Sequence, residues 1–384
     1  MIKRSYLDWN ATAPLRAEAR FAMEAALALT GNASSVHAEG RAVRRLIEEA
    51  REQVARLMGA DAKNVIFTSG ATEANMLALT PELEIAGRRE PRDRLFVSAI
   101  EHASVRSGGR FAAGSVEELA VTCNGILDLP AFEEAIRKAT RPLVSVMLAN
   151  NETGVVQPIP QIAKIVHAAS GVLHVDAVQC PGRIDCDIAQ LGADLVSISS
   201  HKIGGPQGAG ALVRRGDIHV AEPLIRGGGQ ERGQRAGTEN VPAIAGFGAA
   251  AAAVKLTDAG RVAAQRDRLE TGLKAVTPEA VIFGSNARRL PNTSAFAVPG
   301  IKAETAIIAF DLNGIAVSSG SACSSGKVQA SHVLAAMGAD SALIRGGVRV
   351  SLGWSTADAD VEHFLETWNV LAGSLLKERS GIAA

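Results

Sequence analysis

Short apolar runs and longer amphipathic stretches alternate along the first two thirds of the chain. In "AVRRLIEEAREQVARLMG" the apolar side chains recur at helical spacing and Gly59 follows, which predicts an amphipathic helix. The runs "NVIFTS", "RLFVSA", "LVSVMLAN", "VLHVDA" and "DLVSISS" have the composition of strands, and helical stretches such as "DLPAFEEAIRKAT" and "IPQIAKIVHAAS" separate them. Strand alternating with helix at this spacing predicts a mostly parallel sheet covered on both faces, an α/β fold.

The pattern changes towards the C-terminus. A long helical stretch from about Pro242 through Val276 leads into "TSAFAVP", "GIAVSSG" and "VRVSLGW", and a final amphipathic run begins at Asp358. This order favours a smaller α+β layer. We therefore predict a large α/β domain over residues 16–257 and a small domain made of residues 1–15 and 258–384.

Composition narrows the function classes. The 384 residues are 47% hydrophobic, enough for a large core, and Lys plus Arg equals Asp plus Glu at 40 each, so no basic excess favours nucleic acid. The N-terminus lacks the apolar region of a signal peptide, and the most apolar run, Ala243 to Val254, is too short to span a bilayer. We expect a cytoplasmic protein without a nucleic-acid or membrane partner.

The chain has four cysteines, and none lies in a CxxC pair or near a histidine at zinc-ligand spacing. Reduced thiols and no metal site are expected. Cys323 lies in "SSGSACSSG", where small neighbours offer little to bury it. This composition favours a reactive thiol on a mobile loop over a cysteine that packs as a small hydrophobic residue.

Polar residues follow the apolar strands at the end where open α/β sheets bind ligands. In "VIFTSGATEAN" a strand ends in Thr68 and Ser69, and Gly70 permits a tight turn. Ala71, Thr72 and Glu73 begin a helix whose free N–H groups suit a phosphate, although a simple helix cap has the same pattern. In "LHVDAVQ" Asp176 ends a buried strand and Gln179 follows. Such a carboxylate needs a helix cap, an ion pair or a protonated cofactor nitrogen as partner.

Lys202 follows another apolar strand in "LVSISSHKIGGPQGAG". A lysine that is partly desolvated at a strand end can form a Schiff base, whereas most lysines are solvated surface charges. His102 follows "RLFVSA", and Asn151 follows "LVSVMLA". Arg349 lies on a short alternating strand, so its side chain points either to solvent or into a cleft.

Seven motifs, "TSGATEAN", "EHASV", "ANNETG", "HVDAVQ", "SSHKIGGPQGAG", "GGGQERGQRAGTEN" and "SSGSACSSG", occur in an order that resembles the class I cysteine desulfurases. These form the NifS and IscS group of the class V aminotransferase family. The resemblance extends from "YLDWNATAP" to "VRVSLG" and implies fold type I, pyridoxal 5'-phosphate and a homodimer. It implies conversion of L-cysteine to L-alanine.

The resemblance also implies a role for single residues. Lys202 would hold the cofactor aldehyde, Asp176 would pair with its pyridinium nitrogen and Gln179 with its phenolic oxygen. His102 would stack on the ring and assist proton transfer. Arg349 with Asn151 would bind the substrate carboxylate, and Cys323 would accept the sulfur as a persulfide. The phosphate would be held by Ala71, Thr72, Ser199, His201 and Thr238 of the partner subunit.

The acceptor of the sulfur is left open by the sequence, with iron–sulfur cluster assembly, including that of nitrogenase, and tRNA thiolation as the candidates. An iron–sulfur scaffold is the acceptor that we expect. Two alternatives remain: a pyridoxal-phosphate-dependent lyase or aminotransferase of the same fold that does not use Cys323, and a non-catalytic sulfur carrier or scaffold. "GGGQERGQRAGTEN" is either a flexible charged loop or part of a subunit interface.

Overall fold

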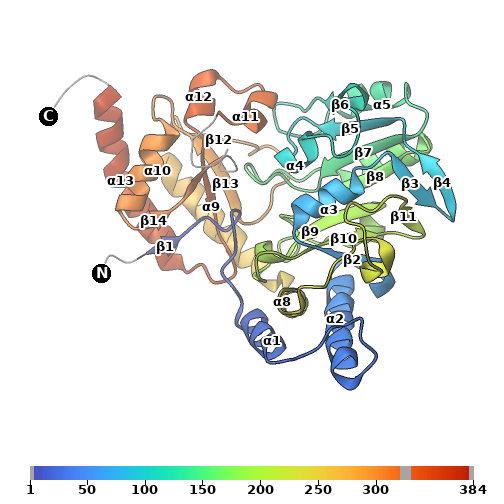
Figure 1. Cartoon of the computed structure of the whole chain (residues 1–384). Coiled ribbons are helices and arrows are strands. Elements are labelled where there is room, and N and C mark those ends of the chain that lie inside the picture. Colours follow the sequence, from blue (N-terminus) through green and yellow to red (C-terminus); the bar gives the residue numbers. More distant parts are fainter. Residues whose placement is uncertain (1–3, 321–329, 380–384) are drawn as a thin grey trace.

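The computed structural model describes residues 4–320 and 330–379, so Cys323 lies outside the described residues. A seven-stranded sheet forms the centre of the larger part (Figure 1). Its strand order is β2-β10-β9-β8-β7-β5-β6, and β6, β5, β7, β8 and β9 run parallel, whereas β10 is antiparallel to both of its neighbours. The strands are β2 (Val65–Thr68), β5 (Arg94–Ser98), β6 (Val116–Leu119), β7 (Pro142–Met147), β8 (Val172–Asp176), β9 (Leu195–Ser199) and β10 (Gly210–Arg214).

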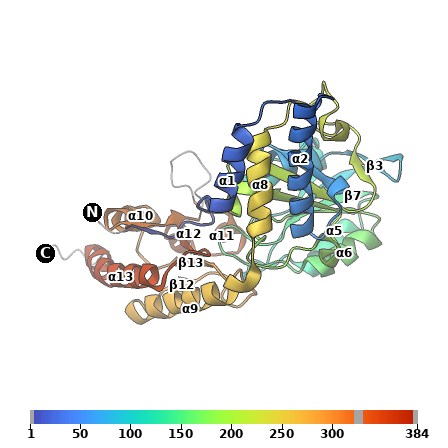
Figure 2. The ribbon, with the colours of Figure 1, turned by 90° about the horizontal axis from the view of Figure 1, so that it is seen from below.

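Both faces of this sheet are buried, which explains why its strands are continuous apolar runs. Alternate residues enter different cores: Val65 and Phe67 pack on one side, Ile66 on the other. The first core is covered by α2 (Ala38–Leu57), α5 (Leu129–Ile136), α6 (Ile159–Ala168), α7 (Ile188–Leu191) and α8 (Val241–Ala253), with α1 (Ala17–Leu27) packed on α8 (Figure 2). The second core is covered by α3 (Ala71–Ala78) and α4 (Ala103–Arg106).

A three-stranded sheet that the sequence pattern did not predict lies beside the second core. It consists of β3 (Glu82–Ile85), β4 (Arg88–Pro91) and β11 (Ile218–Val220), in the order β11-β3-β4. Leu83, Ile218 and Val220 are its buried apolar residues. The sheet thus extends the apolar cover of the second face.

The C-terminal part contains an antiparallel sheet of order β12-β13-β16-β15. Its strands are β12 (Val281–Ile282), β13 (Thr293–Ala297), β15 (Ser318–Ser319) and β16 (Val348–Ser351). Its helices are α9 (Ala259–Val276), α10 (Ala303–Leu312), α11 (His332–Ala336), α12 (Ser341–Arg345) and α13 (Asp358–Arg379). Phe296, Phe310, Phe364 and Trp368 form the aromatic centre of its core.

The N-terminal segment packs with this C-terminal part. β1 (Ser5–Tyr6) pairs in parallel with β14 (Ile315–Ala316), and Leu7 is buried in the core of the small sheet. From there residues 8–12 run between the small sheet and the central sheet. The division at residue 257 stays a prediction.

One predicted element was wrong in its extent. The helical stretch expected from about Pro242 through Val276 is interrupted at Val254, whose backbone is extended (φ −63°, ψ 130°), and α9 begins only at Ala259. The two segments, Val241–Ala253 and Leu256–Val276, are bent by 54°. Among the described residues no single helix has the length and apolar character to cross a membrane; these two pass that test only as a bent pair.

Candidate active site

A cavity of about 600 Å³ lies at the carboxyl ends of the central strands. It gathers ten of the residues that the sequence proposed for the site, from six separate segments. Thr238 is exposed and is not among the residues that line it, and Cys323 lies outside the described residues. The ten lining residues are Ala71, Thr72, His102, Asn151, Asp176, Gln179, Ser199, His201, Lys202 and Arg349.

The turn between β2 and α3 forms one end of the cavity. Gly70 is the N-cap of α3 and no side chain caps this helix, so its first N–H groups remain available to an anion. Gly210 lets β10 pass close behind the turn, because a Cβ there would lie 2.6 Å from the carbonyl carbon of Gly70. Uncapped N–H groups beside a cavity fit a phosphate group.

His201 lies on the same side, just after β9. Burial, and secondarily the nearby charge of Lys202, lowers the pKa of His201 to about 4, so its imidazole is neutral near pH 7. Its Nδ1 lies 3.1 Å from the hydroxyl oxygen of Thr12. A neutral imidazole held in this way can contact a phosphate as a hydrogen-bond donor without adding charge.

Asp176 ends β8 and is only 6% exposed. Its Oδ2 accepts a hydrogen bond from Asn75 Nδ2 (2.9 Å) and its Oδ1 accepts one from Val178 N (3.0 Å). These two donors fix the carboxylate plane in the cavity wall. A carboxylate held there suits a protonated ring nitrogen.

His102 is the N-cap of α4. Its Nδ1 accepts from the backbone N–H of Ser104 (3.2 Å) and lies 2.8 Å from Ser104 Oγ, so the neutral ring carries its proton on Nε2. Ser104 Oγ also accepts from Asn75 Nδ2 (2.9 Å). Asn75 and Ser104 therefore join His102 to Asp176 in one hydrogen-bonded network.

The N-terminal segment Asp8–Thr12 contacts most of the remaining site residues. Lys202 Nζ donates to the carbonyl oxygens of Asn10 (2.5 Å) and Ala11 (2.8 Å). Gln179 Nε2 donates to the same Asn10 oxygen (3.1 Å), and Gln179 Oε1 accepts from Arg183 Nη1 (2.5 Å). Because Arg183 can only donate, it fixes the orientation of the Gln179 amide.

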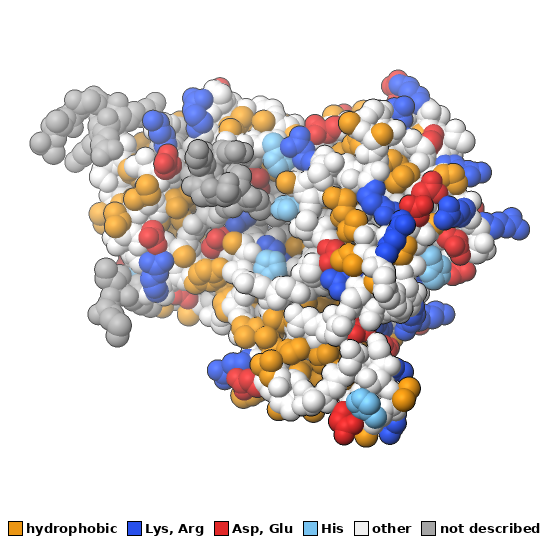
Figure 3. Space-filling model, in the orientation of Figure 1, with side chains coloured by type: hydrophobic (Ala, Val, Ile, Leu, Met, Phe, Trp, Pro, Cys, Tyr) orange, Lys and Arg blue, Asp and Glu red, His pale blue; other side chains and the backbone are white. Residues whose placement is uncertain are grey.

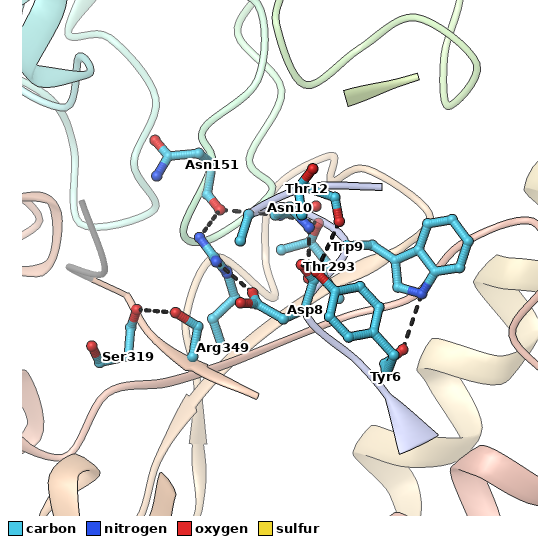
Figure 4. Close-up of polar contacts among 12 residues, drawn as sticks. Tyr6, Asp8, Trp9, Asn10, Thr12, Asn151, Thr293, Ser319 and Arg349 are labelled. Atoms are coloured by element: carbon cyan, nitrogen blue, oxygen red, sulfur yellow. Dashed lines mark hydrogen bonds and ion pairs between the residues drawn. The ribbon is translucent and has the colours of Figure 1, made fainter. Parts of the chain in front are cut away.

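Arg349 points into the cavity and not to solvent, since it is 3% exposed and lines the cavity wall. Figure 4 shows its guanidinium between Asp8 and Asn151: Nη2 donates to Asp8 Oδ1 (2.7 Å) and Nη1 to the backbone oxygen of Asn151 (3.1 Å). The amide side chain of Asn151 points away from Arg349. Asn151 thus positions Arg349 through its backbone, and its predicted contact with substrate stays a prediction.

Several site residues were missed by the sequence reasoning. Asn75, buried on an apolar helix face, and Ser104, two residues after His102, were detectable as polar residues beside predicted ones. Asp8 contacts Arg349 and Asn10 contacts Asn151, partners that lie more than a hundred residues away in the chain. Arg183 acts through its contact with Gln179. Local sequence patterns could not reveal the roles of these three residues.

The charged loop "GGGQERGQRAGTEN" is anchored to its own chain. Glu231 is buried and forms a two-point ion pair with Arg51 (2.6 and 2.9 Å), and it accepts a hydrogen bond from Phe67 N (2.9 Å). Arg235 pairs with Glu73 at 2.9 Å. The reading of this stretch as a freely flexible loop was therefore wrong for these residues.

Comparison with known proteins identifies the family. The family model for aminotransferase class-V matches residues 5–364. The chain belongs to this family. A cysteine desulfurase of Cereibacter sphaeroides is 41% identical over 372 residues, covering 95% of each chain, and cysteine desulfurase IscS 1 of Archaeoglobus fulgidus is 41% identical over 91% of each. The structure of a NifS-like protein from Rickettsia africae is similar with a TM-score of 0.86 at 34% identity, over 99% of this chain and 100% of the other.

These findings confirm the predicted family and the predicted α/β fold of type I. Class V aminotransferases depend on pyridoxal 5'-phosphate. The residues of this chain fit that cofactor, because an uncapped helix start, a fixed carboxylate and a lysine amine surround one cavity. The individual roles of the site residues stay predictions.

Proposed function

We propose that the chain is a cysteine desulfurase that converts L-cysteine to L-alanine and passes the sulfur to a protein acceptor. One observation carries the proposal: Lys202, Asp176 and Arg349, which meet three separate chemical needs of such a reaction, line the same cavity. Relatives named cysteine desulfurase that align over nearly the whole chain support it.

Pyridoxal phosphate would lie between the start of α3 and the carboxylate of Asp176. Lys202 would hold it covalently, Ala71, Thr72, Ser199 and His201 would surround its phosphate, and Asp176 would face its ring nitrogen. When bound, the cofactor supplies an electron sink for the pair left when the Cα proton is removed. Asp176 serves this chemistry by keeping the ring nitrogen protonated.

The remaining steps belong to side chains of this chain. Arg349 would bind the substrate carboxylate and thereby set the direction of Cα, and the Lys202 amine would take the Cα proton. His102 carries a proton on Nε2 and can donate or accept it next to the ring. Gln179 presents its NH₂ group in a fixed orientation because Arg183 occupies its oxygen.

Cys323, outside the described residues, is proposed from the sequence as the sulfur acceptor. Its thiolate attacks the sulfur of cysteine, an S–S bond forms, and the substrate C–S bond breaks with its electron pair going to carbon. A thiol plus L-cysteine gives a persulfide plus L-alanine, so the sulfur is oxidised as the carbon is reduced. No further oxidant is needed.

Mass spectrometry tests this proposal. After brief exposure to cysteine without reductant, the wild-type enzyme is expected to carry one extra sulfur on the peptide that contains Cys323, and Cys323→Ala should form only background alanine. Cys123 is exposed and is the matched control: Cys123→Ala should stay active. Full activity in Cys323→Ala would favour a lyase without a protein thiol, and a wild type that forms no alanine would favour a non-catalytic carrier.

The partners and the location are part of the same proposal. A homodimer is supported by the exposed apolar side chains over α1 and the segments on either side of it, visible in Figure 3, and by the exposure of Thr238 outside its own cavity. The exposed apolar residues there are Leu15, Phe21, Leu27, Leu29 and Val36. An iron–sulfur scaffold as acceptor and a cytoplasmic location complete it, and co-purification of acceptor proteins tests the former.

A further inference from the structure

The arginine proposed for the substrate carboxylate already has a carboxylate beside it. Asp8 Oδ1 lies 2.7 Å from Arg349 Nη2 (Figure 4), and their side chains are 20% and 3% exposed. Asp8 is not among the residues that line the cavity, whereas Arg349 is. The chain therefore places a negative charge against the side of Arg349 that does not face the ligand.

The backbone of Asp8 is held on both sides, so its Cα keeps its position relative to this arginine. Trp9 N donates to Ser351 O (3.3 Å) and Ser351 N donates to Leu7 O (2.8 Å), which ties the segment to β16, the strand that carries Arg349. Tyr6 Oη also donates to the Asp8 carbonyl oxygen (3.1 Å). Asp8 is thus a built-in partner and not a mobile competitor.

The guanidinium is only partly used by its protein partners. Besides Asp8, Arg349 donates to the Asn151 oxygen, and among the described residues its buried Nε has no hydrogen-bond partner. Arg51, which is buried in the large part, differs: it bonds Glu231 at two points, and its Nε donates to Glu48. The incomplete pairing at Arg349 leaves donors for a ligand.

Charge explains why a partial partner is useful. A buried guanidinium without a counter-ion would attract any small anion, while a saturated one would bind none. Two further charged groups interact electrostatically with Arg349. Burial, and then the charge of Arg349, lowers the pKa of Arg183 to about 10. Burial raises the pKa of Glu152. Asp8 is the group in direct ion-pair contact.

We propose that Asp8 is a specificity-determining residue, a resident counter-ion that orients Arg349 and keeps its site free of ambient anions, so that an amino-acid carboxylate binds by geometry. The inference rests on the proposed function in one respect, that Arg349 receives the substrate carboxylate. It predicts that the wild-type site binds small anions more weakly than it would if Arg349 had no carboxylate partner.

Two substitutions separate charge from orientation. Asp8→Asn keeps an oxygen acceptor beside Nη2 but removes the charge, and calorimetry on the holoenzyme is expected to show at least about tenfold tighter binding of both propionate and chloride. Asp8→Ala removes both the charge and the acceptor. Chloride, which is spherical, should keep its gain, while propionate should lose most of its own because the guanidinium is no longer oriented.

Matched controls use neutral and distant partners. Propionamide lacks the charge and should bind equally to wild type and Asp8→Asn. Asp311 of α10 forms an exposed 2.8 Å ion pair with Arg4, and Asp311→Asn should leave the binding constants of both anions unchanged. In activity assays with cysteine, chloride should become a competitive inhibitor of Asp8→Asn at concentrations that do not affect the wild type.

The outcomes distinguish the inference from the proposed function. Arg349→Gln should lose propionate binding; if it binds propionate like the wild type, the carboxylate subsite in the proposed function is wrong and this inference falls with it. If Arg349→Gln loses propionate but Asp8→Asn matches the wild type for both anions, or binds both more weakly, only the counter-ion role of Asp8 is overturned.

Discussion

On one side of the cavity, Asp176 and Ser199 are the last residues of β8 and β9, two adjacent parallel strands, and Lys202 follows three residues later. On the other side, Arg349 depends on Asp8 and Asn151, which are 341 and 198 residues away in the chain. We call these the cofactor wall and the substrate wall.

The two walls hold their side chains by different means. In the cofactor wall, buried strands that pair along their length fix the position of each strand end, and local contacts such as Val178 N to Asp176 complete it. In the substrate wall, the pairing of β16 with β13 and β15 fixes the backbone of Arg349, but its side chain is oriented by single contacts with Asp8 and Asn151, which lie far away in the chain. We therefore expect substitutions in the first wall to affect chemistry and those in the second to affect binding and specificity.

The largest expected effect is in the cofactor wall. Lys202→Ala should lower alanine formation by at least about 10⁴-fold, because it removes both the proposed attachment point of the cofactor and the amine proposed to take the Cα proton. Borohydride reduction followed by peptide mass spectrometry should find the cofactor on the Lys202 peptide in the wild type only. Lys164 is exposed on α6, and Lys164→Ala should behave as the wild type; cofactor fixed elsewhere at full activity would contradict the assignment.

Asp176→Asn should lower turnover on the order of 10²- to 10³-fold while cofactor content, measured by absorbance, changes little. The amide can keep the hydrogen bond from Asn75 but has no charge to hold a proton on the ring nitrogen. Asp185 is exposed close by, and Asp185→Asn is the control. Wild-type turnover in Asp176→Asn would leave the carboxylate with a structural role only.

Arg349→Gln sharpens the comparison, since it should act mainly on binding. Loss of a charged hydrogen-bonding partner should raise the KM for cysteine by about 10- to 100-fold with a smaller change in kcat. Arg268, paired with Glu362 at the surface at 2.8 Å, gives the control variant Arg268→Gln. A fall in kcat at unchanged KM would place Arg349 with the cofactor wall instead.

The same contrast explains what the sequence could predict. The cofactor wall was found because each of its motifs is a strand followed by a polar turn, a local pattern. Asp8 and Asn10 were quoted only as the start of the resemblance, since nothing near them in sequence reveals that they contact Arg349 and Asn151. Long-range pairing of this kind leaves no periodicity.

Two errors in the fold have related causes. The bend at Val254 carries neither glycine nor proline at the break, and the alanine-rich stretch before it is an excellent helix former, so tertiary packing ends α8 where local preference would continue it. The hairpin of β3 and β4 turns at Ala86 and Gly87, both with positive φ, in place of the usual Asn-Gly pair, and its strands are highly charged. Neither feature has a strong local signal.

The smallest expected effect concerns Glu101, a carboxyl behind the cofactor wall that is fully buried. Burial raises its pKa well above the usual value, although a hydrogen bond from Met147 N opposes this and the charge of Asp176 adds to it. Between the unfolded pKa near 4.5 and the raised folded pKa, the native state binds more protons than the unfolded state, so this group makes stability fall as pH rises.

Glu101→Gln should therefore gain stability relative to wild type at pH 7 to 8, and that gain should vanish below about pH 4. Urea unfolding at both pH values measures this, with Glu134→Gln on the exposed face of α5 as the control. A gain that is equal at both pH values would show that Glu101 is not held protonated behind Asp176, and the cofactor wall would then contain two buried negative charges in place of one.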